Sequence, residues 1–89
     1  MIIISIDNDI YLLPDNEGWN IFSGKSLEKD HIVRFLKLEN EETYFDTIFE
    51  NEEIAISVAK MIKTELRKGE KNISIIADKE TNSALLVKI

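Results

Sequence analysis

One segment of this 89-residue chain has the pattern of an amphipathic helix, and it spans residues 51–68. Apolar side chains recur there at intervals of three and four residues, which places them on one face of a helix. Asn51 is a favourable N-cap, two acids follow it in the first turn, and Gly69 suits the position just after the last turn. The segments on both sides are rich in β-branched residues and are divided by turn residues, which indicates strands. The chain must therefore combine one helix with several strands.

These patterns predict an α+β fold with a mostly antiparallel sheet. The expected strands comprise residues 2–6, 10–13, 19–23, 31–38, 43–49, 72–77 and 83–89. Residues 31–38 fit either a helix or a strand, and we favour a strand because residues 43–49 form a suitable hairpin partner. We therefore expect about five strands, then the helix at 51–68, and finally a C-terminal hairpin, with the helix packed on one face of the sheet.

Length and composition exclude several classes of protein. A chain of 89 residues makes a single domain over residues 1–89, and 44 % hydrophobic residues are enough for a core. The chain has no cysteine, which excludes disulfides, thiolate zinc sites and a cysteine nucleophile. The first residues lack the basic region of a signal peptide, and no apolar stretch approaches the about 18 residues that span a membrane. We therefore expect a cytoplasmic protein without membrane contact.

The chain shows no complete motif for catalysis or for cofactor binding. Residues 23–26 end in the Gly-Lys-Ser order of a phosphate-binding loop, but the first glycine of that loop would have to be Trp19. His31 is the only histidine, and the adjacent Asp30 would point away from it in a strand, which disfavours a Ser-His-Asp triad. The Asp-Asn-Asp sequence at residues 7–9 fits a turn better than a calcium loop. We therefore expect no enzyme activity, no cofactor and no metal site.

The negative charge of the chain is concentrated in residues 39–53. This window holds seven of the 17 acids and no Lys or Arg, so the remaining ten acids and 11 bases nearly balance. The predicted partner-binding residues are these seven acids, Glu39, Glu41, Glu42, Asp46, Glu50, Glu52 and Glu53. Each acid also has a local explanation, as part of a solvated hairpin tip or of a helix start. Alternatively, they follow one strand for about 20 Å and form an acidic edge.

The acidic edge leads to a first functional hypothesis, a small acidic binding protein that is not an enzyme. The edge would occupy the basic groove of a nucleic-acid-binding protein, in a complex that weakens steeply with salt. Direct binding to nucleic acid or to anionic lipid is not expected, because both repel carboxylates. In size and charge the chain resembles small acidic α+β proteins of phages that inhibit host nucleases, restriction or CRISPR systems. This resemblance implies an inhibitor or modulator from a phage or a bacterium.

A surplus of apolar surface leads to a second hypothesis. Several strands carry apolar residues on both faces, whereas a sheet covered on one side should alternate apolar with polar residues. The residues predicted for the uncovered face are Ile3, Tyr11, Leu13, Ile76 and Leu86. They are buried if the sheet curls on itself, if a homodimer forms, or if a dedicated partner covers them. The second hypothesis is a homo-oligomeric structural or regulatory domain in which the acids provide solubility.

Overall fold

The computed structural model describes residues 1–14 and 18–87, and in these residues it confirms the α+β fold. The elements are β1 (Ile2–Ile6), β2 (Asp9–Leu13), β3 (Trp19–Lys25), β4 (His31–Lys37), β5 (Thr43–Phe49), α1 (Glu52–Arg67), β6 (Asn72–Asp78) and β7 (Ser83–Leu86). The ambiguous segment is a strand, as favoured above. The last strand was expected to reach Ile89, and its residues 88–89 lie outside the described residues, as do residues 15–17.

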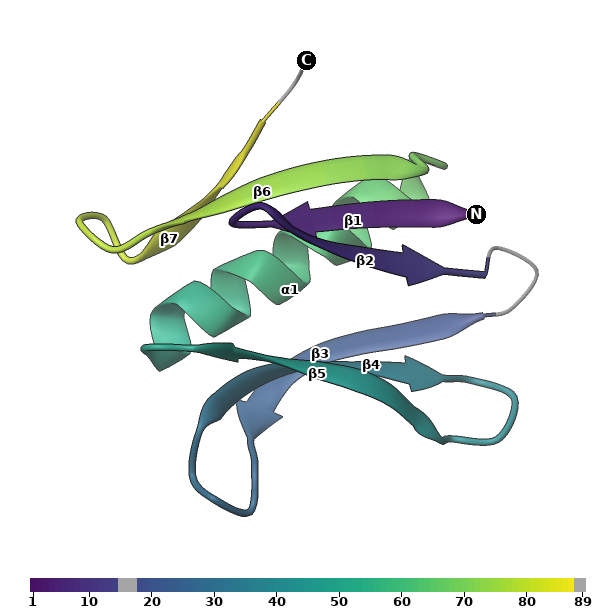
Figure 1. Cartoon of the computed structure of the whole chain (residues 1–89), viewed down its shortest axis with the longest axis horizontal. Coiled ribbons are helices and arrows are strands. Elements are labelled where there is room, and N and C mark those ends of the chain that lie inside the picture. Colours follow the sequence, from purple (N-terminus) through teal and green to yellow (C-terminus); the bar gives the residue numbers. More distant parts are fainter. Residues whose placement is uncertain (15–17, 88–89) are drawn as a thin grey trace.

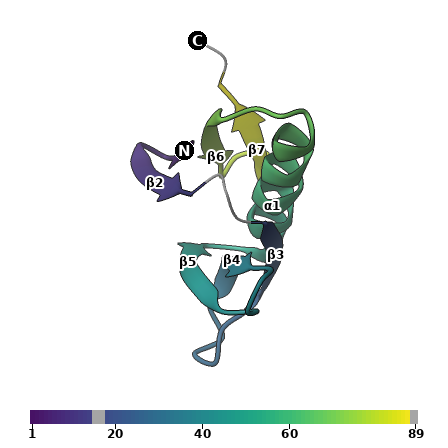
Figure 2. The same cartoon turned by 90° about the vertical axis from the view of Figure 1, so that its right-hand side faces the viewer.

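The strands form two sheets, where the sequence led us to expect one. The first sheet has the order β2-β1-β6-β7 and joins the N-terminal and C-terminal hairpins through the parallel pair β1 and β6. The second sheet is the antiparallel series β3-β4-β5. The first sheet lies at the top of Figure 1 and the second at the bottom, with α1 between them. The quarter-turn view shows that α1 closes one side of the space between the sheets (Figure 2).

The hydrophobic core fills the space that the two sheets and α1 enclose. Its largest fully buried side chains are Phe35, Ile4, Leu13, Ile21, Ile54, Ile62, Ile75, Val33 and Val58, which come from both sheets and from the helix. Burial of apolar area stabilises a fold by about 25 cal/mol per Å², so this shared core holds the three parts together. The second sheet and α1 together thus cover one apolar face of the first sheet.

Local sequence signals explain the limits of α1. The side chain of Asn51 accepts a hydrogen bond from the Ile54 N–H at 2.9 Å, which is the N-cap that the sequence predicts. The Asn51 amide also donates to Asn82 Oδ1 at 2.9 Å and so connects the helix start to the β6–β7 turn. At the other end, Lys68 is the C-cap and Gly69 has a φ of +82°, the left-handed conformation that glycine adopts readily.

The turn between β1 and β2 sets the register of the first sheet. Asp7 and Asn8 have φ angles of 50° and 74°, and two successive positive φ values are typical of a tight two-residue hairpin turn. Asp7 Oδ1 accepts a hydrogen bond from the Ala77 N–H at 2.8 Å, which connects the turn to β6. The resulting register places Tyr11 opposite Ile4 and therefore decides which side of β2 faces the core.

Candidate functional site

One face of the first sheet packs on the core, and the opposite face is largely exposed. We call this second side the outer face and define it by Ile3, Ser5, Ile10, Leu12, Ser74, Ile76, Leu85 and Val87. None of these eight side chains carries a charge. Ile10 is 67 % exposed and Leu85 is 50 % exposed, which is unusual for large aliphatic side chains that share one surface. Asn72 and Asp78 continue the outward positions of β6 at the rim.

Strand register brings the residues of the outer face together, because residues directly opposite each other point to the same side of a sheet. Val87 continues the pairing of β7, since its N–H donates to the Ser74 carbonyl at 2.8 Å. The successive rows across the sheet are Leu12 and Ile3, then Ile10, Ser5, Ser74 and Val87, then Ile76 and Leu85. Two small serines therefore occupy the middle of the face, and larger apolar side chains surround them.

Three of the residues predicted for the uncovered face lie on the core side instead, so the prediction was wrong for Tyr11, Leu13 and Leu86. Tyr11 is opposite Ile4, and Leu86 is opposite Ile75. Because both partners are buried, Tyr11 and Leu86 pack against the core. Leu13 is itself fully buried and belongs to that core.

The prediction placed Ile3 and Ile76 correctly on the outer face. It missed the other apolar members, which are Ile10, Leu12, Leu85 and Val87. Residues 10–13 are all apolar, so their pattern gives no sign of which alternate pair faces the core. A shift of one residue in register exchanges the two faces of a strand, and only the pairing with β1 decides between them.

The structure exposes all seven acids of the window, but ion pairs engage two of them. Asp46 forms a bidentate pair with Arg34, with Nε–Oδ1 at 2.9 Å and Nη2–Oδ2 at 3.0 Å. Glu50 Oε1 accepts a hydrogen bond from Lys79 Nζ at 2.6 Å. The hydrogen bonds to these carboxylates raise the pKa of Arg34 and the pKa of Lys79. The negative charges of Asp46 and Glu50 are therefore compensated within the chain.

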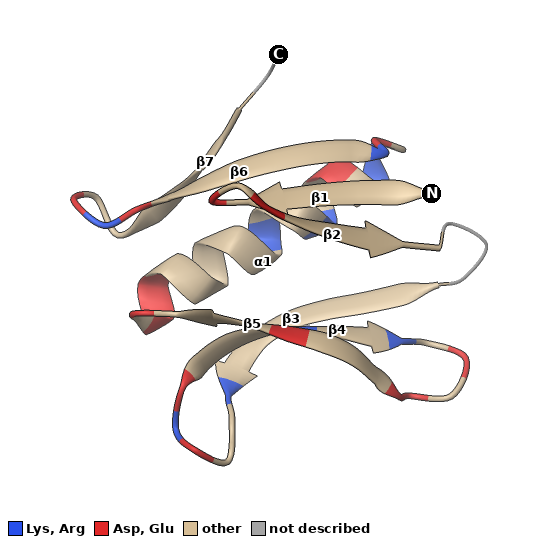
Figure 3. Cartoon of the chain, viewed as in Figure 1, with Lys and Arg blue, Asp and Glu red and all other residues tan. Residues whose placement is uncertain are grey.

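The other five acids form two separate groups. Glu39, Glu41 and Glu42 lie in the turn between β4 and β5, whereas Glu52 and Glu53 form the first turn of α1. Figure 3 shows the two groups at opposite ends of β5. Strand β5 has seven residues, so it separates them by about 20 Å. Because the acid between the groups is paired, the window does not form one continuous ridge of free carboxylates.

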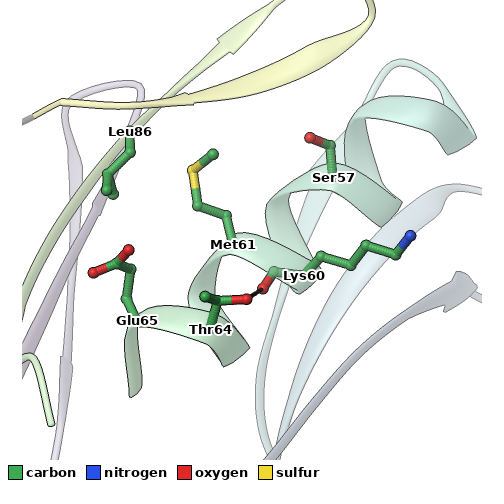
Figure 4. Close-up of a pocket in the computed structure, with 6 residues that line it drawn as sticks. All are labelled: Ser57, Lys60, Met61, Thr64, Glu65 and Leu86. Carbon is green, nitrogen blue, oxygen red and sulfur yellow. Dashed lines mark hydrogen bonds between the residues drawn. The ribbon is translucent and has the colours of Figure 1, made fainter. Parts of the chain in front are cut away.

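An open pocket of about 320 Å³ lies between α1 and β7 (Figure 4). It is lined by Ser57, Lys60, Met61, Thr64, Glu65 and Leu86. The Ser57 hydroxyl accepts a hydrogen bond from the Ala84 N–H at 2.9 Å, and the Glu65 carboxylate accepts one from Lys68 at 3.4 Å. The Thr64 hydroxyl donates to the Lys60 carbonyl at 2.9 Å. These polar groups are therefore used to hold α1 and its neighbours in place.

Titratable side chains do not gather into a metal site in the part of the chain that the structure describes. Within it, no three His, Cys, Asp or Glu side chains lie close enough to share an ion. His31 stands at the start of β4, and its Nδ1 is buried without a hydrogen-bond partner. Over the same residues, no helix combines the length and apolar character that crossing a membrane requires.

Comparisons of the chain with protein-family models, with curated proteins and with solved structures find no match. The functional argument therefore depends on the geometry of the described residues. Of the surfaces above, the outer face combines the most exposed apolar side chains with the absence of charge among its eight members. It is the strongest candidate for a contact surface.

Proposed function

We propose that the protein is a non-enzymatic domain that forms a homodimer through the outer face of its first sheet and serves a structural or regulatory role. The observation that carries this proposal is the uncharged outer face, on which Ile10, Leu12, Ile76 and Leu85 are each about half exposed or more. Removing such side chains from water is favourable, and the largest exposed apolar patch of a protein often marks a contact surface. Two sheet faces pack well against each other at about 10 Å.

The absence of charge among the eight residues of the outer face allows a second copy to occupy it. The chain has a net charge of −6, so two copies repel each other over most approaches. The outer face contains no charge among its eight members, and two such faces meet without burying one. The outward side of the second sheet differs, because the Arg34–Asp46 pair lies across it between β4 and β5. Burial of that pair would carry a desolvation cost.

The shape of the outer face suits a two-fold symmetric dimer, in which the outer face of one copy packs against the outer face of the other. Ser5 and Ser74 are opposite each other in register and leave a low centre. Ile10 and Val87 stand on either side of them in the same row. The larger side chains of one copy therefore pack over the serines of the other, in the way that facing sheets interdigitate.

The size of the outer face predicts a weak dimer. Four strands, each about 4.8 Å wide, cover about 19 Å, and the outward residues of one strand extend over about 14 Å. Each copy therefore buries on the order of 300 Å² of its surface. The area buried by both copies together is smaller than the about 1,200 Å² that both partners of a stable complex bury. We expect a reversible dimer with a Kd in the micromolar range or weaker.

Sedimentation velocity over a wide range of concentration tests this proposal. The wild-type chain should pass from monomer to dimer as its concentration rises. Ile76→Lys places a charge on the outer face and should weaken the dimer by about tenfold or more, because the charge becomes buried in the interface. Ile48→Lys is the matched control, since Ile48 is 68 % exposed on the second sheet and should leave the dimer unchanged.

Two results would contradict the proposal. One is a wild-type chain that stays strictly monomeric at millimolar concentration. The other is a dimer that Ile48→Lys disrupts and Ile76→Lys does not, which would place the interface on the second sheet. Circular dichroism of both variants checks that each substitution leaves the fold intact.

Binding of a basic protein by the acidic window stays a prediction, and the geometry favours it less. Asp46 and Glu50 are already paired, and the remaining acids lie in two groups at opposite ends of β5. A partner would have to bridge both groups to use them together. We place either function in the cytoplasm, as the sequence led us to expect.

A further inference from the structure

We propose that two copies of the chain pair along the free edge of β2, antiparallel and centred on Tyr11, and so join their first sheets into one continuous sheet. This contact goes beyond the outer-face dimer, because it uses backbone groups of Ile10 and Leu12 that the packing of two faces leaves exposed. It engages fewer residues of each copy than the outer face does. We therefore expect it to be the weaker contact and to form at higher concentration.

The register of β2 leaves backbone groups free at its edge. The Ile3 N–H of β1 donates to the Lys71 carbonyl at 2.8 Å, on the side of β6. Neighbouring residues of a strand bond to opposite sides, so the next residue of β1 bonds to β2, where its partner is Tyr11. Ile10 and Leu12 therefore turn their N–H and C=O groups away from β1. Among the described residues, no backbone bond satisfies these outward groups.

The edge of β2 is accessible to another strand. The two residues that carry the outward groups are themselves exposed, Ile10 by 67 % and Leu12 by 48 %. Among the described helices and strands, only β1 has Cα atoms within 8 Å of those of β2. Figure 2 shows β2 on the side of the molecule opposite α1. Neither the helix nor the core therefore blocks this edge.

The other edge strands of the two sheets are each protected against such pairing. α1 packs along β3 and β7, and its Ser57 hydroxyl already accepts a hydrogen bond from the Ala84 N–H of β7. β5 carries the charged Asp46 in its middle, and its pairing with β4 shifts register beside Phe35. β2 pairs without a register shift, and its residues 10–13 carry no charge. The geometry therefore leaves β2 as the edge that another strand can join.

A second copy fits this edge because β2 is complementary to itself. In antiparallel register around Tyr11, Ile10 of one copy lies opposite Leu12 of the other, and each such pair exchanges both of its hydrogen bonds. The two Tyr11 side chains lie next to each other at the symmetry axis, on the core side, as an aromatic cross-strand pair. Asp9 is the one charged residue of β2 and lies at the rim of the contact.

Edge pairing also enlarges the outer face. The outer faces of two paired copies lie on the same side of one sheet and together cover about 600 Å². Two such surfaces packed on each other bury about 1,200 Å² in total, which is the size of the smallest stable complexes. The edge contact would therefore convert weak outer-face dimers into a more stable tetramer. This consequence, unlike the edge contact itself, rests on the proposed function.

Amide hydrogen exchange followed by NMR tests the edge contact in the wild-type chain. The Ile10 and Leu12 amides point to solvent in the monomer, so they should exchange about tenfold more slowly at millimolar than at low micromolar concentration. Leu12→Pro removes an outward N–H without breaking a bond to β1, and it should abolish the protection of the Ile10 amide. Ile48→Pro is the matched control in the edge strand β5 and should leave that protection unchanged. Circular dichroism checks the fold of both variants.

Three results would overturn the proposal. The first is equal exchange of the Ile10 and Leu12 amides at both concentrations in the wild-type chain. The second is full protection of the Ile10 amide in folded Leu12→Pro, which would assign the protection to packing of the outer face. The third is an equal loss of protection in both proline variants. The outer-face dimer is measured by sedimentation of Ile76→Lys, which changes β6 and not this edge, so the failures of the two contacts are distinguishable.

Discussion

The ring of Tyr11 in β2 stacks on the ring of Phe45 in β5, with the centroids 4.7 Å apart and the planes 12° from parallel. Phe45 stacks in turn on Phe35 of β4, at 4.3 Å. Tyr11 belongs to the first sheet and the two phenylalanines to the second, so this stack joins the sheets opposite the side that α1 closes. The contact depends on residues that are far apart in the sequence.

Loss of this stack should destabilise the protein. We expect Tyr11→Ala to lower the free energy of unfolding by about 2 kcal/mol, because it removes apolar contacts between the sheets. A double-mutant cycle with Phe45→Ala should give a coupling energy of about 1 kcal/mol, measured by urea unfolding. Ile10→Ala on the same strand is the control and should cost less, since Ile10 faces outward. Additive effects of the two aromatic substitutions would mean that the rings do not interact.

Tyr11 should also make stability fall at alkaline pH. Burial, and then the nearby charge of Asp9, raise the pKa of the Tyr11 phenol above its ordinary value of 10.0. The folded chain therefore retains this proton at a pH where the unfolded chain has released it. The contribution of the protonated Tyr11 phenol to the free energy of unfolding is complete below pH 10.0, and it is lost as the pH rises above this value. Urea unfolding at a series of alkaline pH values should show a shallower decline in Tyr11→Phe, and equal declines would contradict the assignment.

The glycine after α1 should be far less replaceable than the glycine in β3. Gly69 has a φ of +82°, and an alanine there is strained, so Gly69→Ala should cost about 1 kcal/mol. At Gly24, a Cβ would meet no other atom within 4 Å. Gly24→Ala should therefore be neutral or slightly stabilising, because alanine reduces the entropy of the unfolded chain. Thermal unfolding of both variants makes the comparison, and equal losses of stability would refute the conformational argument.

Reversal of the acidic window separates the two functional hypotheses. Changing Glu41, Glu42, Glu52 and Glu53 together to Lys should leave the dimer intact, because none of them lies on the outer face. Sedimentation of the folded variant provides the measurement. Removing the acids from the first turn of α1 should lower the stability of the helix, and circular dichroism measures this effect separately. If the reversal abolished self-association while the fold was retained, the interface would have to include the acidic groups.

The local elements of this fold were predictable because their determinants are neighbours in the sequence. The Asn51 cap, the apolar stripe and Gly69 together define α1, and each acts within a turn or two of the helix. The tight turn at Asp7 and Asn8 likewise defines the first hairpin. The strand at His31–Lys37 was favoured only because a second strand followed it at hairpin distance, which is again a short-range relation.

Tertiary structure alone decided the surfaces. Residues 10–13 are apolar at every position, so the choice between Tyr11 and Ile10 for the core came from the pairing of β2 with β1 and from the stack on Phe45. The division into two sheets and the Glu50–Lys79 pair likewise join segments that are distant in sequence. Periodicity reports which residues share a side of one element. Which side becomes the interior depends on contacts between elements, and these form only when the whole chain packs.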